Sequence, residues 1–137
     1  MLELAKWIYE NYPGMKRMMP FWKFLSILDR YEDRIAVIED ENGKFKGAAI
    51  YVRLTDEVLN DILLGNLSMT SVEDMEEILA EEGKNIHFIR VIADGPRTIL
   101  KGLKQVIAKE NPDTVSWYKP DMDGIHFVYS RRELCHQ

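Results

Sequence analysis

The sequence predicts a single α+β domain over residues 1–137, built on a mixed, mostly antiparallel sheet. Three observations predict it: helical spacing of apolar residues near the N-terminus, an Asn-Gly turn between two β-rich runs, and an apolar strand that leads into an amphipathic helix. The order of elements is then ααββααβαββ. One parallel strand–helix–strand pair, two N-terminal helices and two inserted helices make up the predicted fold.

Composition narrows the class of protein. With 137 residues, 46% of them hydrophobic and 30% charged, the chain can bury a core without disulfides or a metal ion. Its net charge of −5 argues against nucleic acid or an anionic membrane surface as a partner. The lone cysteine, Cys135, and an N-terminus without a basic, apolar leader favour a cytoplasmic protein.

Two N-terminal helices follow from the apolar periodicity. Residues 2–12 repeat an apolar or aromatic side chain at every fourth position, and Pro13–Gly14 ends the run. Pro20 suits the first turn of a second helix over residues 20–29, because its missing N–H costs no hydrogen bond there. That helix has an i, i+3, i+4, i+7 stripe of Phe21, Phe24, Leu25 and Leu28.

A hairpin is predicted next. Residues 34–39 are rich in β-formers, residues 45–54 form the partner strand, and Asn42–Gly43 supplies the turn. Gly47, which is followed by two alanines, indicates a bulge or a close backbone approach at the start of the second strand.

The inserted helices are expected near residues 56–64 and 71–82. Ser71 suits the N-cap of the second helix, with Asp74 three residues on, and Gly83 suits its C-terminal end. This second helix is strongly acidic. Its acidic face either receives a basic peptide or polyamine or is simply solvated.

The central strand is predicted at residues 86–93, since these are nearly all apolar, as in strands covered on both faces. Asp94–Gly95–Pro96 turns the chain into a helix over residues 97–110. We expect residues 114–119 to pair in parallel with the central strand, and residues 125–130 to follow after a turn. The apolar side of the helix carries Ile99, Leu100, Leu103, Val106 and Ile107.

The turn after the central strand combines the features of an anion site. It opens a helix, where backbone N–H groups are unpaired and the helix dipole is positive. We expect the amides of Arg97, Thr98 and Ile99 to be the donors, helped by the first two side chains. Arg97, Lys101 and Lys104 share one helix face, which suits a polyphosphate. The alternative is the solvated outer face of an amphipathic helix.

In this order of elements the chain resembles the GNAT superfamily of acyl-CoA-dependent N-acyltransferases, over nearly its whole length. The resemblance implies that acyl-CoA, with acetyl-CoA as the expected form, places its pyrophosphate on amides of the strand-to-helix turn. Its pantetheine arm would pair with the edge of the 86–93 strand, where this strand splays from the 114–119 strand. Carried over residue by residue, the resemblance implicates Gly95, Arg97, Thr98 and Ile99. Ile92 and Ala93, at the end of the strand, and Lys101, on the basic helix face, complete the expected cofactor site.

The sequence departs from this family at two places. The turn contains one glycine and is shorter than the Arg/Gln-x-x-Gly-x-Gly/Ala pattern of the family. A turn at residues 121–124 replaces the helix that often brings a tyrosine general acid. This compact ending is similar to the RTX toxin-activating lysine acyltransferases, which use acyl carrier protein, but their N-terminal catalytic histidine has no counterpart here. The alternative function is therefore a catalytically inactive GNAT-like binding or assembly module.

Acylation of an amine, whether on a small molecule or a peptide, needs a base and an acid for the leaving thiolate. Glu39, Asp40 and Asp94 end two predicted strands and are the candidate bases, with solvation or helix capping as the alternative. Tyr118 is the candidate acid, with core packing as the alternative. No metal-ligand spacing or nucleotide-binding glycine motif occurs in the sequence.

Other residues keep two interpretations each. His87 is either a core histidine or a base. Arg90 lies on a strand that is expected to be buried, so it needs an acidic partner or faces an anionic ligand. The aromatic residues of the first helix either pack between helices or form a wall for the substrate: Trp7, Tyr9 and Tyr12.

Overall fold

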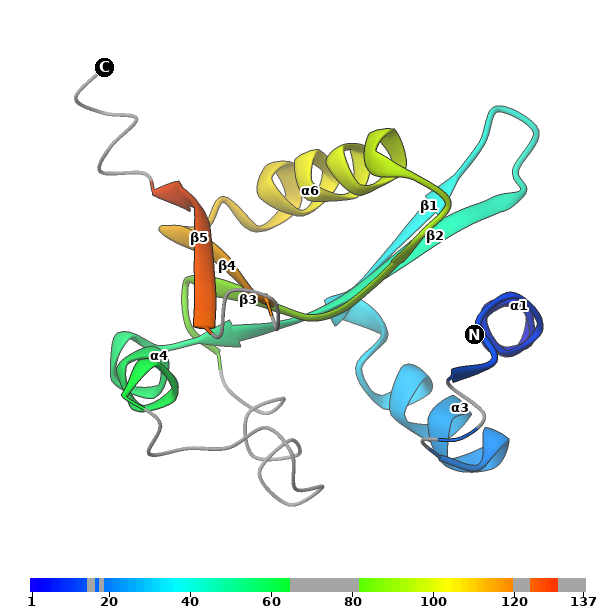
Figure 1. Ribbon diagram of the computed structural model, residues 1–137, viewed down its shortest axis with the longest axis horizontal. Coiled ribbons are helices and arrows are strands. Elements are labelled where there is room, and N and C mark those ends of the chain that lie inside the picture. The colour runs from blue at the N-terminus through cyan, green and yellow to red at the C-terminus, as the bar shows by residue number, and fades with distance from the viewer. Residues whose placement is uncertain (15–16, 18, 65–81, 120–123, 131–137) are drawn as a thin grey trace. The chain divides into compact units, whose positions relative to one another are not determined.

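The computed structural model describes residues 1–14, 17, 19–64, 82–119 and 124–130 (Figure 1). These residues form an α+β structure, as predicted. Its helices are α1 (Leu2–Asn11), α3 (Phe21–Arg30), α4 (Asp56–Leu63) and α6 (Pro96–Glu110), with a short 3₁₀ helix at Glu32–Arg34. Its strands are β1 (Ile35–Glu39), β2 (Phe45–Leu54), β3 (Asn85–Ala93), β4 (Thr114–Lys119) and β5 (Gly124–Ser130). The predicted helix over 71–82, the turn at 121–124 and Cys135 fall outside the described residues, apart from the last residue of each of the first two segments.

The sheet has the order β1-β2-β3-β4-β5 among the described strands. β1 pairs with β2, and β4 with β5, in antiparallel fashion. β3 and β4 are parallel, with Asn85 opposite Thr114 and Phe88 opposite Trp117. The predicted mixed sheet with one parallel pair, joined through α6, is therefore confirmed.

The β1–β2 hairpin turns at the predicted residues. Gly43 has a φ of 78°, a conformation that glycine adopts without strain. Asp40 organises the loop, because its Oδ1 accepts from the amides of Asn42 at 2.8 Å and Lys44 at 2.9 Å. These bonds favour the ionised carboxylate and hold the pKa of Asp40 below its usual value. Asp40, a candidate base in the sequence, thus has a structural role in this turn.

The chain divides into two compact units, residues 1–50 with 91–105 and residues 51–90 with 106–137. The divisions fall inside β2, β3 and α6, so each of these elements contributes to both units.

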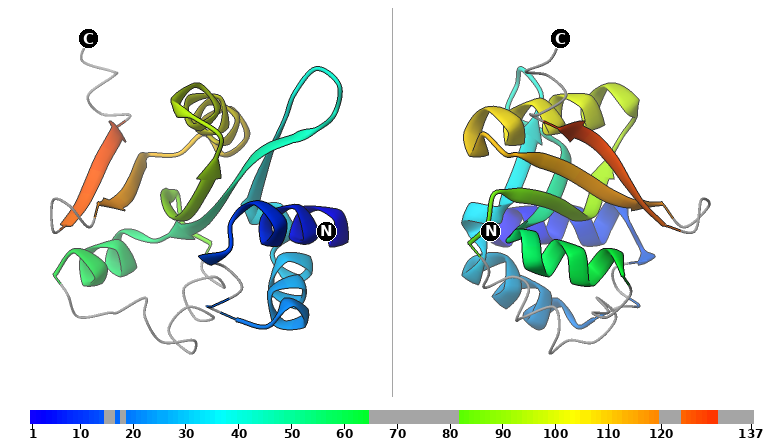
Figure 2. Two further views of the ribbon diagram at one scale, coloured as in Figure 1. Left: turned by 45° about the vertical axis from the view of Figure 1, so that its right-hand side comes forward. Right: turned by 90° about the vertical axis from the view of Figure 1, so that its left-hand side faces the viewer.

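In the first unit, α1 and α3 lie on one side of the β1–β2 hairpin and the first turns of α6 on the other (Figures 1 and 2). Tyr9 joins the two N-terminal helices. Its ring lies 5.2 Å from that of Phe21 and 5.5 Å from that of Phe24, between centroids, and its hydroxyl donates to the carbonyl of Met19 at 2.5 Å. Tyr9 therefore packs between helices rather than lining a substrate site.

In the second unit, polar side chains connect the strand ends. The buried Asn85 donates from Nδ2 to the carbonyl of Leu54 at 3.1 Å and to Asp56 Oδ1 at 2.8 Å. Its Oδ1 accepts from Thr114 Oγ1 at 2.8 Å. Asn85 thus links β2, α4 and β4, and its hydrogen-bonding groups are satisfied in the core.

Gly83 follows the predicted second inserted helix, and the structure gives it another role. Its N–H donates to the carbonyl of Arg53 at 2.9 Å, beside the end of β2. A Cβ at this position would lie 1.9 Å from the carbonyl oxygen of Leu54. The close approach of two backbones requires glycine here.

The burial predicted for β3 is only half correct. Asn85 to Phe88 are buried, but Arg90 and Val91 are exposed. Within the described residues, the register with β4 ends at Phe88 and Trp117, so the later part of β3 lacks this neighbour. The expectation that Arg90 is buried is therefore wrong, although Ile92, two residues further along β3, is buried.

The inward face of α6 agrees with the prediction at Val106 but differs from it at Ile99 and Leu100. Ile99 is 46% exposed and Leu100 is 51% exposed, whereas Gly102 and Val106 are buried. The helix approaches β1 through Gly102, where a Cβ would lie 2.7 Å from Ile38 Cδ1. Among the described residues, no helix is long and apolar enough to cross a membrane.

Candidate functional site

The strand-to-helix turn is attached to the beginning of β2. The amide of Asp94 donates to the carbonyl of Lys46 at 3.2 Å, and Lys46 Nζ lies 3.7 Å from Asp94 Oδ2. Lys46 is the extra residue of a bulge, since Ile38 lies opposite Gly47 and Glu39 opposite Phe45. The bulge that Gly47 indicated in the sequence thus positions a cation beside the turn.

Gly47 also permits a close backbone approach. A Cβ on this residue would lie 2.7 Å from the carbonyl oxygen of Ile92 and 3.1 Å from Thr98 Cγ2. β3 and the first turn of α6 can therefore sit directly on β2 only because position 47 has no side chain. Ile92 is buried and Ala93 half-buried at this junction.

The first turn of α6 has fewer free donors than the sequence suggested. Ile99 N–H donates to the carbonyl of Gly95 at 3.2 Å, so this amide is used inside the helix. Thr98 Oγ1 donates to Asp94 Oδ1, so the hydroxyl is also engaged. The amides of Arg97 and Thr98 remain as first-turn donors, because the helical hydrogen-bond pattern starts only at Ile99. The Arg97 side chain is exposed beside them.

Gly95 has an open environment. A Cβ built there meets nothing within 4 Å, and the residue has no positive φ. Neither packing nor backbone conformation therefore requires a glycine at this position. The residue leaves room for a group from outside the chain to approach the backbone of the turn.

Lys101 has a structural contact in addition to its place on the basic helix face. Its Nζ donates to the carbonyl of Glu39 at 2.9 Å and so connects α6 to the end of β1. Arg97 and Lys104, the other two cations of that face, are both exposed.

Aromatic side chains extend from α1 towards the turn. The Trp7 ring lies 5.7 Å from that of Tyr12 and 5.9 Å from that of Phe45, between centroids. Burial and the nearby carboxylate of Asp94 both raise the pKa of Tyr12, which keeps its phenol protonated. Of the three aromatic residues that either pack between helices or form a wall, Trp7 and Tyr12 thus lie towards the turn, whereas Tyr9 packs between the helices.

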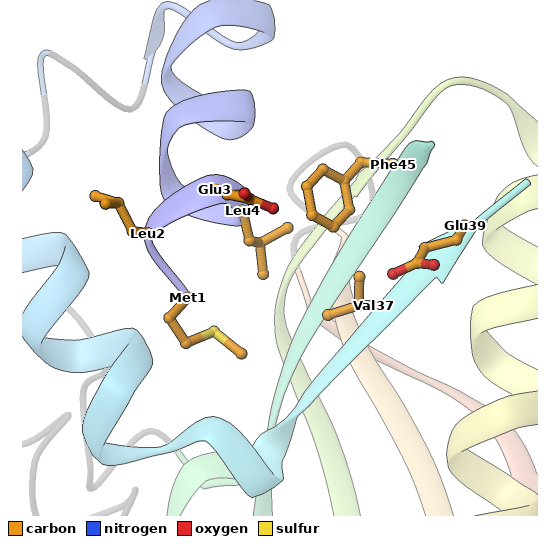
Figure 3. A pocket seen from close by; sticks show the side chains of 7 residues that line it. All are labelled: Met1, Leu2, Glu3, Leu4, Val37, Glu39 and Phe45. Atoms are coloured by element: carbon orange, nitrogen blue, oxygen red, sulfur yellow. The ribbon is translucent and has the colours of Figure 1, made fainter. Parts of the chain in front are cut away.

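Glu39, a candidate base, lines a pocket of about 440 Å³ in the first unit (Figure 3). The other lining residues come from the start of α1 and from β1 and β2: Met1, Leu2, Glu3, Leu4, Val37 and Phe45. Phe45 belongs both to this pocket and to the aromatic cluster with Trp7. Phe45 thus lines the pocket, and the next residue along β2, Lys46, contacts the turn through Asp94.

His87 is a core histidine. It is fully buried, and its Nδ1 lies 2.9 Å from Ser116 Oγ. Burial lowers its pKa to about 4, so the ring is neutral at physiological pH. Tyr118 lies in β4, opposite Ile125 of β5, and its side chain falls outside what the structure describes.

Sequence reasoning missed one member of this site, Lys46, and the proximity of another, Tyr12, to Asp94. Lys46 was not singled out, because its place beside Asp94 depends on the pairing of β2 with β3. Tyr12 was considered without Asp94, because 82 residues of chain separate them (94 − 12). The glycine at position 47 was the local signal for the bulge that positions Lys46.

The comparisons with known proteins leave the family open, since no protein-family model, curated protein or solved structure matches this chain. Function is therefore argued from topology and from the residues described above.

Proposed function

We propose that this chain is a GNAT-like N-acyltransferase, which transfers an acyl group, acetyl in the first instance, from acyl-CoA to an amine. The observation that carries the proposal is the parallel pair of β3 and β4. Their register ends at Phe88 and Trp117, while β3 runs on to Ala93 and leads through Gly95 into α6. This is the strand–turn–helix arrangement on which a GNAT protein would bind acyl-CoA.

The later part of β3 suits the pantetheine arm. An extended chain with amide groups can add to the edge of a strand and pair with its main chain. β3 continues for five residues after Phe88, from 89 to 93, beyond its described register with β4. Exposure of Arg90 and Val91 in this stretch supports access to it.

The turn suits the pyrophosphate. The amides of Arg97 and Thr98 and the positive end of the α6 dipole favour an anion, and the Arg97 guanidinium can add a charge-assisted contact. The negative charge of the Asp94 carboxylate disfavours an anion at the turn, but the ammonium of Lys46 lies beside this carboxylate and offsets its charge. The open space at Gly95 supports a close approach of the phosphates to the backbone.

In the proposed reaction, the amine nitrogen forms a bond to the thioester carbonyl carbon and the carbon–sulfur bond breaks. A base takes a proton from the amine, and an acid gives one to the CoA thiolate. Glu39 is the better candidate base, because Lys46 and Thr98 both engage the carboxylate of Asp94. Tyr118 remains the candidate acid. Tyr12 is a second candidate for this role, because its phenol is close to Asp94.

A thermal-shift titration tests the proposal. CoA and acetyl-CoA should raise the melting temperature, with a stabilisation of about 2.7 kcal/mol at a hundredfold excess over Kd. Pantothenate and ATP serve as matched controls, because each carries only part of the CoA structure. Absence of any response to millimolar CoA would exclude the CoA donor. The same titration with an acylated acyl carrier protein then decides whether acyl carrier protein is the acyl donor in place of CoA.

One observation favours the alternative function, a GNAT-like module without catalysis. Several charged groups near the turn already satisfy one another, since Lys46 and Thr98 engage Asp94 and Lys101 engages the backbone of Glu39. A thiol-release assay with acetyl-CoA and a panel of amines separates the two functions. Binding of CoA without thiol release would favour the module.

A further inference from the structure

The pocket at the start of α1 combines apolar walls with two acids (Figure 3). Leu4, Val37 and Phe45 lie between Glu3 and Glu39 in this view, and both carboxylates are directed towards the pocket. The lining includes five apolar residues and two acidic ones, and none of its seven described side chains is basic. Its volume of about 440 Å³ is in the range of small-molecule sites.

The two carboxylates are available to a ligand. Glu3 and Glu39 are exposed, and within the described part of the chain neither has an ion-pair partner within 4.0 Å. Lys101, the nearby cation, donates to the backbone carbonyl of Glu39 instead of its carboxylate. The carboxylates of Glu3 and Glu39 give the pocket a negative potential, which the α-ammonium of Met1, another lining residue, offsets in part.

From this arrangement we propose that the pocket binds the acyl acceptor, and that the acceptor is a primary ammonium at the end of an unbranched apolar chain. This inference rests on the proposed acyltransferase function and names its substrate class. The carboxylates attract the ammonium, the apolar walls bury the methylene chain, and the face of Phe45 can add a cation–π contact. A bare metal ion would find only two acids among apolar walls, which is a poor set of ligands.

The location of the pocket supports this role. Phe45 lines it, and the next residue, Lys46, accepts the hydrogen bond from the amide of Asp94. Trp7, which contacts Phe45, continues the apolar surface to Tyr12 and the turn. Phe45 and Lys46 thus connect the pocket to the turn along β2, and in the proposed complex Glu39 contacts the nitrogen of the bound amine.

Two sources can supply this chemistry, a free alkylamine or the side chain of lysine. The probes are therefore 1-hexylamine and Nα-acetyl-lysine methylamide, each titrated near pH 7.5 into the full chain. Methyl NMR of Leu and Val residues reports binding at Leu4 and Val37. We expect saturable shifts at these methyl groups with at least one probe, and the tighter probe identifies the source. 1-Hexanol should bind about tenfold more weakly, and hexanoate should not bind.

Variants that replace an acid by its neutral amide test which carboxylates bind the ammonium. Glu39→Gln should weaken binding of the amine about fivefold, and Glu3→Gln combined with it should remove measurable binding. Glu41→Gln is the matched control, because it removes the same charge two residues away and does not line the pocket. Melting curves of all variants should be nearly unchanged, since the three acids are exposed.

Three results would overturn the inference: no methyl shifts with either amine, equal shifts with 1-hexanol, or equal affinity in wild-type and Glu39→Gln proteins. Measuring CoA binding in the same samples distinguishes a failure of the pocket assignment from a failure of the proposed acyltransferase function. CoA binding without amine binding refutes the pocket assignment alone. Amine binding without response to CoA or to acyl carrier protein refutes the acyltransferase, and with it the acceptor role.

Discussion

Lys46 and Asp94 are connected twice, by a hydrogen bond of 3.2 Å between the Asp94 amide and the Lys46 carbonyl and by an ion pair of 3.7 Å between their side chains. The first contact belongs to the pairing of two strands, and the second places a cation beside the start of α6. Lys46 is the extra residue of the bulge in β2. The turn is thus fixed to β2 independently of any ligand, which makes its chemistry testable by substitution.

Arg97→Ala should weaken binding of CoA about tenfold to a hundredfold, because a charge-assisted contact with a phosphate contributes about 1.5–3 kcal/mol. The melting temperature should stay nearly constant, since Arg97 is exposed. Lys104→Ala, on the same helix face but further from the turn, should have a smaller effect on affinity. Isothermal titration with CoA measures both. A lower melting temperature with unchanged affinity would instead make Arg97 a structural residue.

Replacement by alanine should destabilise the fold more at Gly47 than at Gly95. Gly47→Ala should cost about 1–3 kcal/mol of stability, because its Cβ would lie 2.7 Å from the Ile92 carbonyl oxygen. Gly95→Ala should cost about 1 kcal/mol or less, since its Cβ meets nothing within 4 Å. It should nevertheless weaken CoA binding, if phosphates approach the turn there. Urea unfolding and CoA titration of both variants check this, and unchanged affinity in Gly95→Ala would argue against that approach.

Glu110 should be essential for the stability of the second unit. Its Oε2 lies 2.6 Å from Arg53 Nε, and its Oε1 accepts from Arg53 Nη2 at 2.9 Å and from the hydroxyl of Tyr51 at 3.1 Å. These side chains of Arg53 and Glu110 are only 16% and 12% exposed. Glu110→Ala removes the carboxylate that balances the largely buried guanidinium of Arg53, so the free energy of unfolding should fall by about 3 kcal/mol.

Lys109→Ala is the matched control for Glu110→Ala. The Lys109 side chain is 51% exposed, and its Nζ lies 3.9 Å from Glu110 Oε1. Its removal should change the free energy of unfolding by less than about 0.5 kcal/mol. Chemical unfolding followed by circular dichroism measures both variants, and similar losses in the two would contradict the assigned role of Glu110.

His87 should make the fold sensitive to acid. In the unfolded chain it takes up a proton near pH 6.5, but in the folded protein burial lowers its pKa to about 4. The unfolded state therefore binds more protons between these values. Stability is lost as the pH falls from about 6.5 to about 4 and changes no further from this residue below that, for a total on the order of 3 kcal/mol.

His87→Gln removes this titration while keeping a polar side chain of similar size. Urea unfolding at several pH values between 4 and 8 should show a shallower loss of stability in the variant than in the wild-type protein. Carboxylates titrate in both proteins, so the difference between the two curves isolates the histidine. Parallel curves would be evidence that His87 is already protonated, or exposed, in the folded state.

The sequence predicted most elements because their signals are local. The Asn42–Gly43 turn defined the hairpin, and the apolar run with its following amphipathic helix defined the parallel unit. The inward face of α6 was predicted only in part: Val106 is buried as expected, but the face also includes Gly102, which adds nothing to an apolar pattern. Ile99 and Leu100 dominated that pattern and are exposed.

The candidate site was less accessible to sequence reasoning, since its contacts join distant segments. Asp94 was recognised as a strand-end acid, but its partners Lys46 and Tyr12 follow from the pairing of β2 with β3 and the packing of α1. Arg90 was expected in the core, because nothing in the local pattern shows where the register with β4 ends. Burial of a strand depends on its neighbours, and these are set by tertiary pairing.

The position of β3 in the sheet has a consequence for synthesis of the chain. Its partner on one edge, β2, is translated before it, whereas β4, on the other edge, begins 29 residues after Asn85. The antiparallel part of the sheet can therefore form on the ribosome while the parallel edge of β3 waits for α6 and β4 to emerge. Until then the apolar, buried half of β3, from Ile86 to Phe88, has an unoccupied edge. A ribosome pause between residues 93 and 114 would prolong this exposure and favour aggregation of the nascent chain.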